Sequence, residues 1–334
     1  MRADPDGLSA GVAAADKAAI SRALNLVEDR RDAARRDVAA LLERLERVPL
    51  TQQGHRVGLT GPPGVGKSTL AAALARTLRR RGRTVGIVAV DPTSVRSGGS
   101  LLGDRARMGF DPADPGLFVR SLATAGEAGG LAYAANAAVR VLAAAYEVVV
   151  VETTGVGQSE TDVVHVADTV ALVVQPGSGD ALQFLKAGIM EIPDVLVVNK
   201  ADHEELARRT VSDLRGALRS AHAAGVVHGD GGWEVPIVST SAENGRGLDQ
   251  LADALDAHRS HLGGQGLADR RRRGEAAWVL SLLIRRHGEH GVDTLGGRVA
   301  LRDRVSRELS AGASPVALAE ELGAVYLDRV RSGS

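Results

Sequence analysis

Residues 61–69 form the pattern G-x-x-x-x-G-K-[ST], in which glycines, a lysine and a hydroxyl stand at fixed spacing. The glycines of such a loop let backbone N–H groups point at a phosphate where a helix begins, and the helix dipole favours the anion. Lys67 is then placed to reach the β- and γ-phosphates, and Ser68 to bind a Mg²⁺ that bridges them. The candidate phosphate site is the whole loop: Gly61, Pro62, Pro63, Gly64, Val65, Gly66, Lys67, Ser68 and Thr69.

The segments on both sides of this loop are the ones that its chemistry needs. Residues 57–60 are a short, mainly apolar run, and residues 70–76 carry Ala and Leu at helical spacing. The pattern therefore predicts a strand, the loop and a helix in that order. This context favours a true phosphate loop over a chance glycine turn.

Two acidic residues directly follow strongly apolar runs. Asp91 follows residues 84–90, and Glu152 follows residues 147–151. Because ligands of open parallel sheets bind at the carboxyl edge, we expect both carboxylates to face the phosphates and the metal. Gly155 fits the glycine whose N–H meets the γ-phosphate in nucleotide hydrolases. Taken alone, the Asp-Pro pair at position 91 is also an ordinary turn signal.

Two further segments could respond to a bound nucleotide. Residues 94–108 combine glycines with polar residues and predict a loop that orders when γ-phosphate and Mg²⁺ are present. Asp104 could contact metal or water there. Gln158 either positions the attacking water or stabilises its own loop. Three arginines of the first loop are candidates to neutralise transition-state charge, or else ordinary surface residues: Arg96, Arg105 and Arg107.

Base selection is indicated by Asn199, Lys200 and Asp202, which form an N-K-x-D pattern after a short apolar run. A carboxylate accepts both N1–H and the exocyclic N2–H₂ of guanine, whereas adenine offers no such pair of donors. The lysine stem can cover the ring, and the asparagine can tie its loop to the phosphate loop. Ser241 and Ala242 follow the last predicted strand, where a backbone N–H can meet guanine O6. Together these patterns predict bound GTP or GDP.

The composition limits the class of protein and the partners. The 334 residues are 44% hydrophobic, enough for a full core, and 41 basic residues balance 41 acidic ones. This balance gives no electrostatic case for binding nucleic acid or an anionic membrane. Cysteine is absent, and no apolar run approaches the ~20 residues of a membrane span. We therefore expect a cytoplasmic protein without disulfides or thiolate metal sites.

Buried strands and helices alternate along the middle of the chain. The order predicts an α/β fold, a P-loop NTPase with a mainly parallel central sheet flanked by helices. Predicted strands besides 57–60 lie at 84–90, 147–151, 169–174, 195–198 and 235–239.

Three regions are expected from the changes in pattern. Residues 1–50 form an N-terminal helical extension, with residues 1–14 loosely attached and two helices from 16 to 48. Residues 51–262 form the nucleotide-binding domain, closed by a helix at 247–262. Residues 263–334 form a helical arm that follows a glycine linker at 263–266.

With these motifs the chain resembles the MeaB/ArgK family of P-loop GTPases over residues 15–330. The phosphate loop and residues 199–202 are shared by many GTPases, whereas residues 98–108 and 152–160 are peculiar to this family. The resemblance implies a GTP-hydrolysing chaperone of an adenosylcobalamin-dependent acyl-CoA mutase, which gates cofactor loading and protects the mutase. It also implies a homodimer formed through the C-terminal arm, and Mg²⁺ surrounded by three acidic residues: Asp91, Asp104 and Glu152.

Other functions stay open at this point. A GTPase metal-insertion factor is disfavoured by the absence of cysteine and of a histidine cluster. An ATP-dependent kinase linked to transport proteins is disfavoured by the N-K-x-D pattern. A non-catalytic interaction module is disfavoured by the intact phosphate loop. Thr154 and residues 175–183 depart from the common family pattern. These departures leave open which mutase is the client.

Overall fold

A computed structural model describes residues 4–29, 31–49, 52–91, 111, 113–123, 133–153, 163–177, 193–223 and 232–332. The strands are β1 (His55–Thr60), β2 (Val85–Asp91), β3 (Leu117–Ala123), β4 (Val148–Glu152), β5 (Thr169–Val174), β6 (Val195–Val198) and β7 (Ile237–Ser239). The helices are α1 (Pro5–Ala13), α2 (Lys17–Glu28), α3 (Asp32–Glu46), α4 (Lys67–Arg80), α6 (Tyr133–Ala145), α9 (Glu204–Ala223), α10 (Leu248–Thr294), α11 (Arg298–Ser310) and α12 (Pro315–Ser332), with a 3₁₀ turn η2 (Val163–His165).

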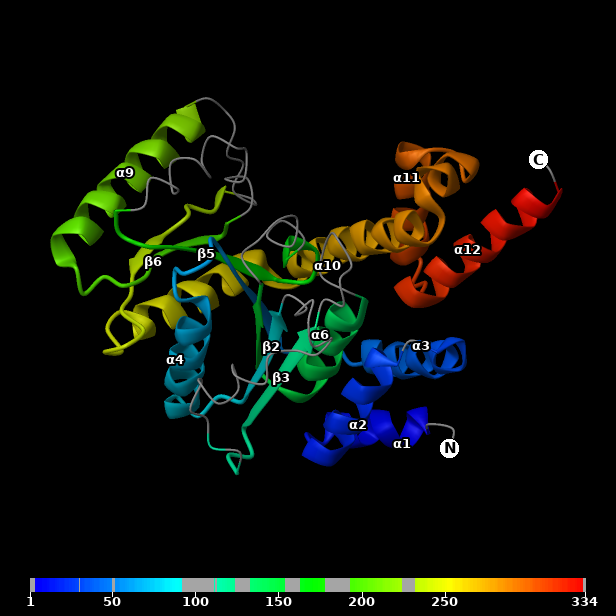
Figure 1. The fold of residues 1–334 in the computed structure, drawn as a ribbon, viewed down its shortest axis with the longest axis horizontal. Coiled ribbons are helices and arrows are strands. Elements are labelled where there is room, and N and C mark those ends of the chain that lie inside the picture. The colour runs from blue at the N-terminus through cyan, green and yellow to red at the C-terminus, as the bar shows by residue number, and fades with distance from the viewer. Residues whose placement is uncertain are drawn as a thin grey trace, which may run out of the picture.

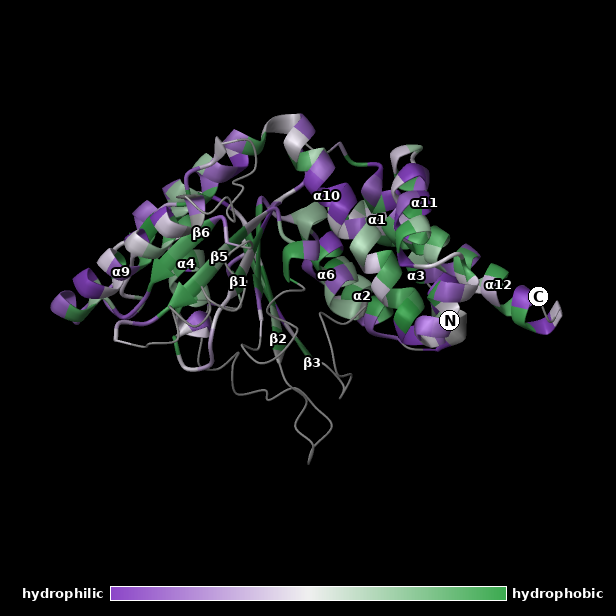
Figure 2. Cartoon of the chain, turned by 90° about the horizontal axis from the view of Figure 1, so that it is seen from above, coloured by the Kyte–Doolittle hydropathy of each residue, from purple (hydrophilic) through white to green (hydrophobic). Residues whose placement is uncertain are grey.

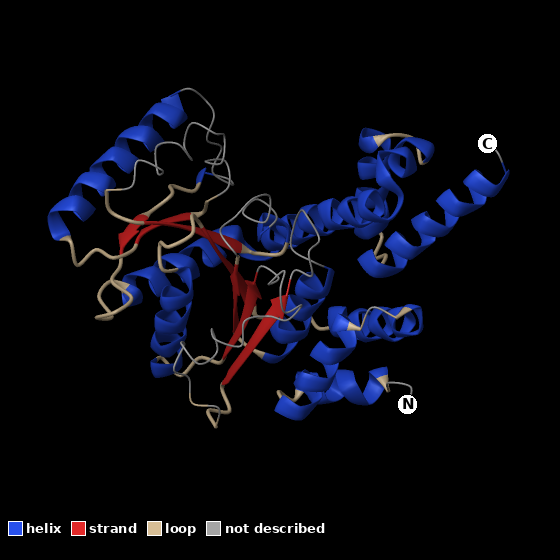
Figure 3. Ribbon diagram, viewed as in Figure 1, coloured by secondary structure: helices blue, strands red, loops and turns tan. Residues whose placement is uncertain are grey.

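The strands form one seven-stranded sheet in the order β3-β2-β4-β1-β5-β6-β7. Every pair of neighbouring strands is parallel. Helices α4 and α6 lie on opposite faces of this sheet (Figure 1), and the strands stand between the helices (Figure 3). The predicted α/β fold with a parallel central sheet is therefore confirmed.

The apolar runs form strands because both faces of the sheet are covered. In β4, Val148 and Val150 pack toward α4 and the first turns of α10, whereas Val149 and Val151 pack toward α6. The strands accordingly carry the hydrophobic colour in Figure 2, while the outer helices mix both colours. Parallel strands of this kind bring all their carboxyl ends to one edge of the sheet.

The edge strand β3 is not predicted by the sequence pattern. Its apolar residues are interrupted by Arg120 and Ser121, which weakens the signal of a buried strand. The structure explains the arginine, because its Nε donates to Glu28 Oε1 of α2 at 2.7 Å. An edge strand needs only one partner strand, and β3 pairs with β2 over its whole length.

The N-terminal helices pack against α6 as one layer. The two helices expected between residues 16 and 48 are confirmed as α2 and α3. The expectation of a loosely attached segment before them is wrong. Helix α1 begins after Asp4, whose side chain accepts from the Asp6 N–H at 3.2 Å, and it buries Leu8 and Val12. A capped helix with two buried apolar residues is firmly attached.

The break expected after residue 262 is present, but it is a kink at Gly263 and not a four-residue linker, because a second helical stretch follows directly. Helix α10 runs from Leu248 to Thr294 and is kinked at Gly263 and Gly288, which have φ values of 58° and 67°. Beyond it, α11 and α12 are helical, as expected for a helical arm, but the sequence pattern did not predict α11 as a separate helix. One apolar cluster extends from α1, α2 and α3 through α6 to α10, α11 and α12.

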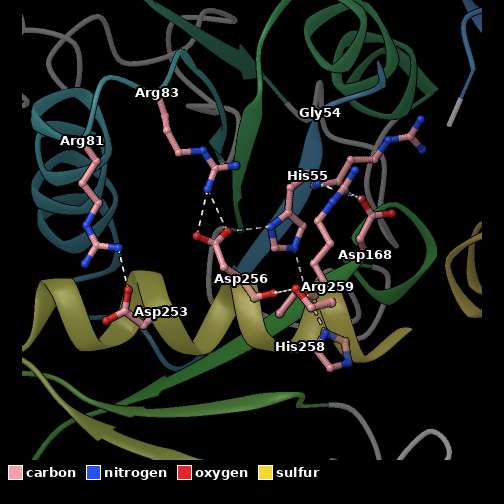
Figure 4. A network of polar contacts seen from close by, with 12 residues as sticks. Gly54, His55, Arg81, Arg83, Asp168, Asp253, Asp256, His258 and Arg259 are labelled. Atoms are coloured by element: carbon pink, nitrogen blue, oxygen red, sulfur yellow. Dashed lines mark hydrogen bonds and ion pairs between the residues drawn. The ribbon is translucent and has the colours of Figure 1, made fainter. Parts of the chain in front are cut away.

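A buried aspartate attaches α10 to the amino edge of the sheet, opposite the phosphate loop (Figure 4). Asp168, directly before β5, accepts from Arg271 Nε at 2.7 Å and from Arg259 Nη1 at 3.3 Å. These two arginines lie on either side of the kink at Gly263. One carboxylate thus holds both parts of the bent helix.

A second aspartate repeats this arrangement before β6. Asp194 accepts from Arg270 Nη2 at 2.6 Å and lies 3.2 Å from His258 Nε2. His258 Nδ1 is 2.8 Å from the hydroxyl of Thr169, and His55 Nε2 is 2.7 Å from the same hydroxyl. Both histidines are fully buried. Burial lowers the pKa of His55 to about 3, so this histidine is neutral in the native protein at neutral pH.

Candidate nucleotide site

The phosphate loop joins the end of β1 to the start of α4, as the sequence predicts. Two of its glycines are required by space as well as by backbone conformation. Gly61 has a φ of 138°, and a Cβ there would lie 2.1 Å from the Val173 carbonyl oxygen. Gly66 has a φ of 90°, and a Cβ there would lie 2.8 Å from Asn199 Nδ2. Only glycine allows the loop to lie this close to the ends of β5 and β6.

The loop presents a lysine and a helix N-terminus to the same place. Gly66 is the N-cap of α4 and supplies no capping side chain, so the first N–H groups of the helix are suited to an anion. The Lys67 side chain is buried, and its ammonium donates to the carbonyl oxygens of Gly61 at 2.7 Å and Pro62 at 3.0 Å. This cation is held at the loop where a phosphate would bind.

Two oxygen ligands suited to Mg²⁺ are in direct contact. The Ser68 hydroxyl, in the first turn of α4, donates to Glu152 Oε1 at the end of β4. Adjacent strands align the two elements, because Leu59 of β1 pairs with Glu152. Among the described residues no group of three or more His, Cys, Asp or Glu side chains could hold a metal. The observed pair still fits Mg²⁺, since magnesium in nucleotide sites takes few protein ligands and completes its shell with phosphates and water.

The remaining predicted metal and γ-phosphate residues are only partly described. Asp91 is the last residue of β2, and Ala89 of that strand pairs with Glu152, so the Asp91 backbone lies at the same edge as the phosphate loop. Asp104, Gly155 and Gln158 lie outside the described residues. Their roles stay predictions, as do those of the three arginines: Arg96, Arg105 and Arg107.

The predicted base loop is tied directly to the phosphate loop. Asn199 Nδ2 donates to the Val65 carbonyl oxygen at 2.9 Å, and its Oδ1 accepts from the Thr240 hydroxyl at 3.2 Å. Lys200 Nζ donates to the Gly64 carbonyl oxygen at 2.7 Å. Asn199 and Thr240 are buried, so the two bonds of Asn199 are shielded from water, whereas the bond of Lys200 is exposed. A base held at residues 199–202 is therefore placed at a fixed distance from phosphates held at residues 61–69.

The carboxylate expected to read the base is oriented by its neighbour. The Ser241 hydroxyl donates to Asp202 Oδ1 at 3.0 Å. The backbone N–H of Asp202 and this hydroxyl lower the pKa of Asp202, so the acceptor stays ionised. The Ser241 N–H already donates to the Arg246 carbonyl oxygen at 2.9 Å. Of the predicted Ser-Ala pair, Ala242 is thus the residue that can offer its N–H to guanine O6.

The geometry unites the candidate phosphate loop, two oxygen groups suited to Mg²⁺ and the candidate base loop at one sheet edge. A family model described as "Methylmalonyl Co-A mutase-associated GTPase MeaB" matches residues 20–290. The chain belongs to the MeaB family. The resemblance that the motifs indicate is therefore confirmed, and the chain is a P-loop NTPase of this family.

Individual known proteins also match most of the chain. A probable GTPase from Mycobacterium bovis is 42% identical over 282 residues, which are 83% of this chain and 82% of that protein. The mitochondrial methylmalonic aciduria type A homolog of Mus musculus is 33% identical over 297 residues, 85% of this chain and 70% of that protein. A solved structure described as a LAO/AO transport system kinase has a TM-score of 0.65 and 25% identity, and covers 96% of this chain and 97% of its own.

Two residues of the site were not predicted as members of it. Gln175 accepts from Lys200 Nζ at 2.9 Å, and Thr240 supports Asn199 as described above. Both directly follow a strand, β5 and β7 respectively. Because every strand ends at the ligand-binding edge, the position alone was a usable signal.

In the part of the chain that the structure describes, no helix is long and apolar enough to cross a bilayer.

Proposed function

We propose that this MeaB-family protein binds and slowly hydrolyses GTP, and that its nucleotide state controls an adenosylcobalamin-dependent acyl-CoA mutase. In this proposal it gates loading of the mutase cofactor and protects the mutase. The observation that carries the GTP assignment is the pair of bonds from Asn199 and Lys200 to the phosphate loop. The mutase assignment is supported by the family description, which names a methylmalonyl-CoA mutase-associated GTPase.

The guanine base is assigned to the loop that follows β6. Asp202 would accept N1–H and N2–H₂, and this ionised carboxylate is already oriented by Ser241. Ala242 would donate its N–H to O6, and the stem of Lys200 would lie along the ring. Because adenine carries no matching pair of donors, the arrangement favours GTP and GDP over adenine nucleotides.

The phosphates are assigned to Lys67 and the first N–H groups of α4. Ser68 and Glu152 would hold Mg²⁺, together with Asp91 and Asp104. When bound, Mg²⁺ neutralises negative charge on the β- and γ-phosphate oxygens.

The loops on either side of this centre would report the nucleotide state. Gly155 would donate its N–H to the γ-phosphate, and Gln158 would orient the attacking water. Release of γ-phosphate would remove the contacts that order residues 94–108 and 155–160. We expect slow turnover by the isolated protein and faster turnover with the mutase, since many GTPases receive a catalytic or ordering contact from their partner.

We also propose three functional regions: residues 1–50, residues 51–262 and residues 263–334. The last region would carry the homodimer contact. This is supported by three large apolar side chains that are exposed on α11 and α12, namely Val299, Leu327 and Val330. Apolar residues exposed in this way can be covered by a second copy of the chain.

A second candidate function is suggested by the solved structure described as a LAO/AO transport system kinase. An ATP-dependent kinase would need an adenine site, which the carboxylate of Asp202 does not favour. Competition of GTP, GDP and ATP for the purified protein separates the two functions. A metal-insertion factor is less favoured, since no cluster of metal ligands occurs among the described residues.

The decisive experiment measures GTP hydrolysis by the purified protein, alone and with each cobalamin-dependent mutase of the source organism. We expect a slow rate that one mutase increases, and an Asp202→Asn variant that needs more GTP to reach it. Slow hydrolysis that no mutase changes would remove the mutase from the proposal and leave the GTPase. Preference for ATP would refute the GTPase.

A further inference from the structure

The ammonium of Lys200 is held at two points. It donates to the Gly64 carbonyl oxygen at 2.7 Å and to Gln175 Oε1 at 2.9 Å. Gln175 directly follows β5, which lies between β1 and β6 in the sheet. The glutamine therefore reaches across from a neighbouring strand end to the loop that follows β6. It belongs to neither the phosphate motif nor the N-K-x-D motif.

The backbone of Lys200 is fixed as well as its tip. Its φ is 58°, in the left-handed region that residues other than glycine rarely occupy. Such a conformation persists only where the surroundings determine it. With the backbone fixed at one end and the ammonium bonded at the other, the methylene stem is confined between residue 200 and the phosphate loop. A confined stem offers an apolar strip with its charge held to one side.

We propose that Gln175 is a positioning residue for recognition of the guanine base, acting through Lys200. This inference depends on the proposed GTP site, because the confined stem is the surface along which the purine ring would lie. Without the amide acceptor, the ammonium keeps only its hydrogen bond to the Gly64 carbonyl oxygen, and the side chain of Lys200 gains conformational freedom. Binding of the base must then restrict that freedom, which costs binding free energy. The contribution concerns the base and not the phosphates, so GDP and GTP are affected alike.

The test compares Gln175→Met, which keeps the length of the side chain but lacks the acceptor, with Gln175→Glu, which keeps an oxygen. Dissociation constants of fluorescent GDP and non-hydrolysable GTP are measured, together with hydrolysis at saturating GTP. We expect Gln175→Met to raise both dissociation constants about three- to tenfold, the range of one hydrogen bond to a charged group that is partly exposed to water. Gln175→Glu stays within about twofold of the wild type, and saturated hydrolysis is unchanged in both.

A double-mutant cycle shows whether the effect passes through the lysine. In a Lys200→Ala background, Gln175→Met should cause no further loss, because its partner is already gone. The matched control is Gln265→Met on α10, where the glutamine donates to Asp269 far from residues 61–69 along the chain. This control should leave both dissociation constants unchanged.

Three results would overturn the inference. These are an unchanged affinity in Gln175→Met, an equal loss in the Lys200→Ala background, or a loss confined to GTP. Thermal unfolding of each variant identifies general destabilisation of the fold. Such destabilisation would weaken nucleotide binding by Gln175→Glu and Gln175→Met alike. A wild-type protein that binds no guanine nucleotide would instead refute the proposed function itself, so the two failures are distinguishable.

Discussion

Replacing Asp168 by asparagine removes the negative charge that attaches α10 to the sheet. The carboxylate is fully buried and receives four hydrogen bonds. Oδ2 accepts from the Arg56 N–H at 2.9 Å, from Arg271 Nη2 at 2.7 Å and from Arg259 Nη1 at 3.3 Å. Oδ1 accepts from Arg271 Nε at 2.7 Å. The amide of asparagine has one oxygen and one NH₂ group in place of the two carboxylate oxygens. In either orientation of the amide, the NH₂ group therefore faces an N–H donor whose hydrogen bond it cannot accept.

The expected loss of stability follows from the hydrogen bonds that the buried Arg271 keeps and the charge partner that it loses. After the substitution, Arg271 still donates to Gln53 Oε1 at 2.6 Å and to the Gly54 carbonyl oxygen at 3.1 Å, but it has lost its counter-ion. Removing one partner of a buried ion pair costs about 3–5 kcal/mol, because the remaining charge stays desolvated. Since whole proteins are stable by only about 5–15 kcal/mol, Asp168→Asn should remove a large share of the free energy of unfolding.

The assay is urea unfolding at pH 7 of the wild type and two variants. Asp253→Asn is the matched control, because Asp253 also lies on α10 and accepts from Arg81 at 2.7 Å, but its side chain is 69% exposed. An exposed pair of this kind contributes about 0–1 kcal/mol. Losses of similar size in the two variants, both below about 1 kcal/mol, would refute the stabilising role of the buried charge. Native Asp168→Asn should still bind GDP, since the substitution lies at the opposite edge of the sheet.

Three other substitutions test separate parts of the molecule. His55 has a native pKa of about 3 against about 6.5 when unfolded, so the unfolded state binds more protons between these values. The free energy of unfolding should then fall by up to about 1.4 kcal/mol for each pH unit below 6.5, and His55→Gln should flatten this slope in urea titrations between pH 6.5 and 4. Lys67→Ala should abolish most nucleotide affinity and hydrolysis, and normal turnover in this variant would contradict the phosphate-loop assignment. Asp202→Asn should weaken GTP relative to xanthosine triphosphate in competition binding, and an unchanged preference for GTP would contradict the base assignment.

The clustering of the candidate nucleotide-site residues could largely be predicted from sequence, because these residues directly follow strands. The phosphate loop, Glu152 and residues 199–202 each follow an apolar run directly, and a parallel sheet brings such ends together. The bond between Ser68 and Glu152 follows from this arrangement once β1 and β4 are neighbours. The roles of Asp104, Gly155 and Gln158 stay predictions, since these residues lie outside the described ranges.

The features that the sequence did not predict depend on distant contacts. Three glycines within residues 263–266 read as a linker, but Arg270 and Arg271 bond to aspartates of the sheet and hold the helix beyond its kink. Helix α11 had a usable signal, because Leu301, Val305 and Leu309 recur every four residues and are all buried. Its many charged residues obscured that pattern.

Strands β5 and β6 have different partners at their two ends. At the amino end, Thr169 and Asp194 bond to His258 and Arg270 of α10. At the carboxyl end, Gln175 after β5 accepts from Lys200 of the base loop, which follows β6. A strand of six residues spans roughly 20 Å at about 3.3 Å per residue, and the central strands of a packed sheet do not slide past one another freely. Helix α10 and the base loop are thus attached to the same two rigid elements, so a shift of one relative to the other must break hydrogen bonds at one of these ends.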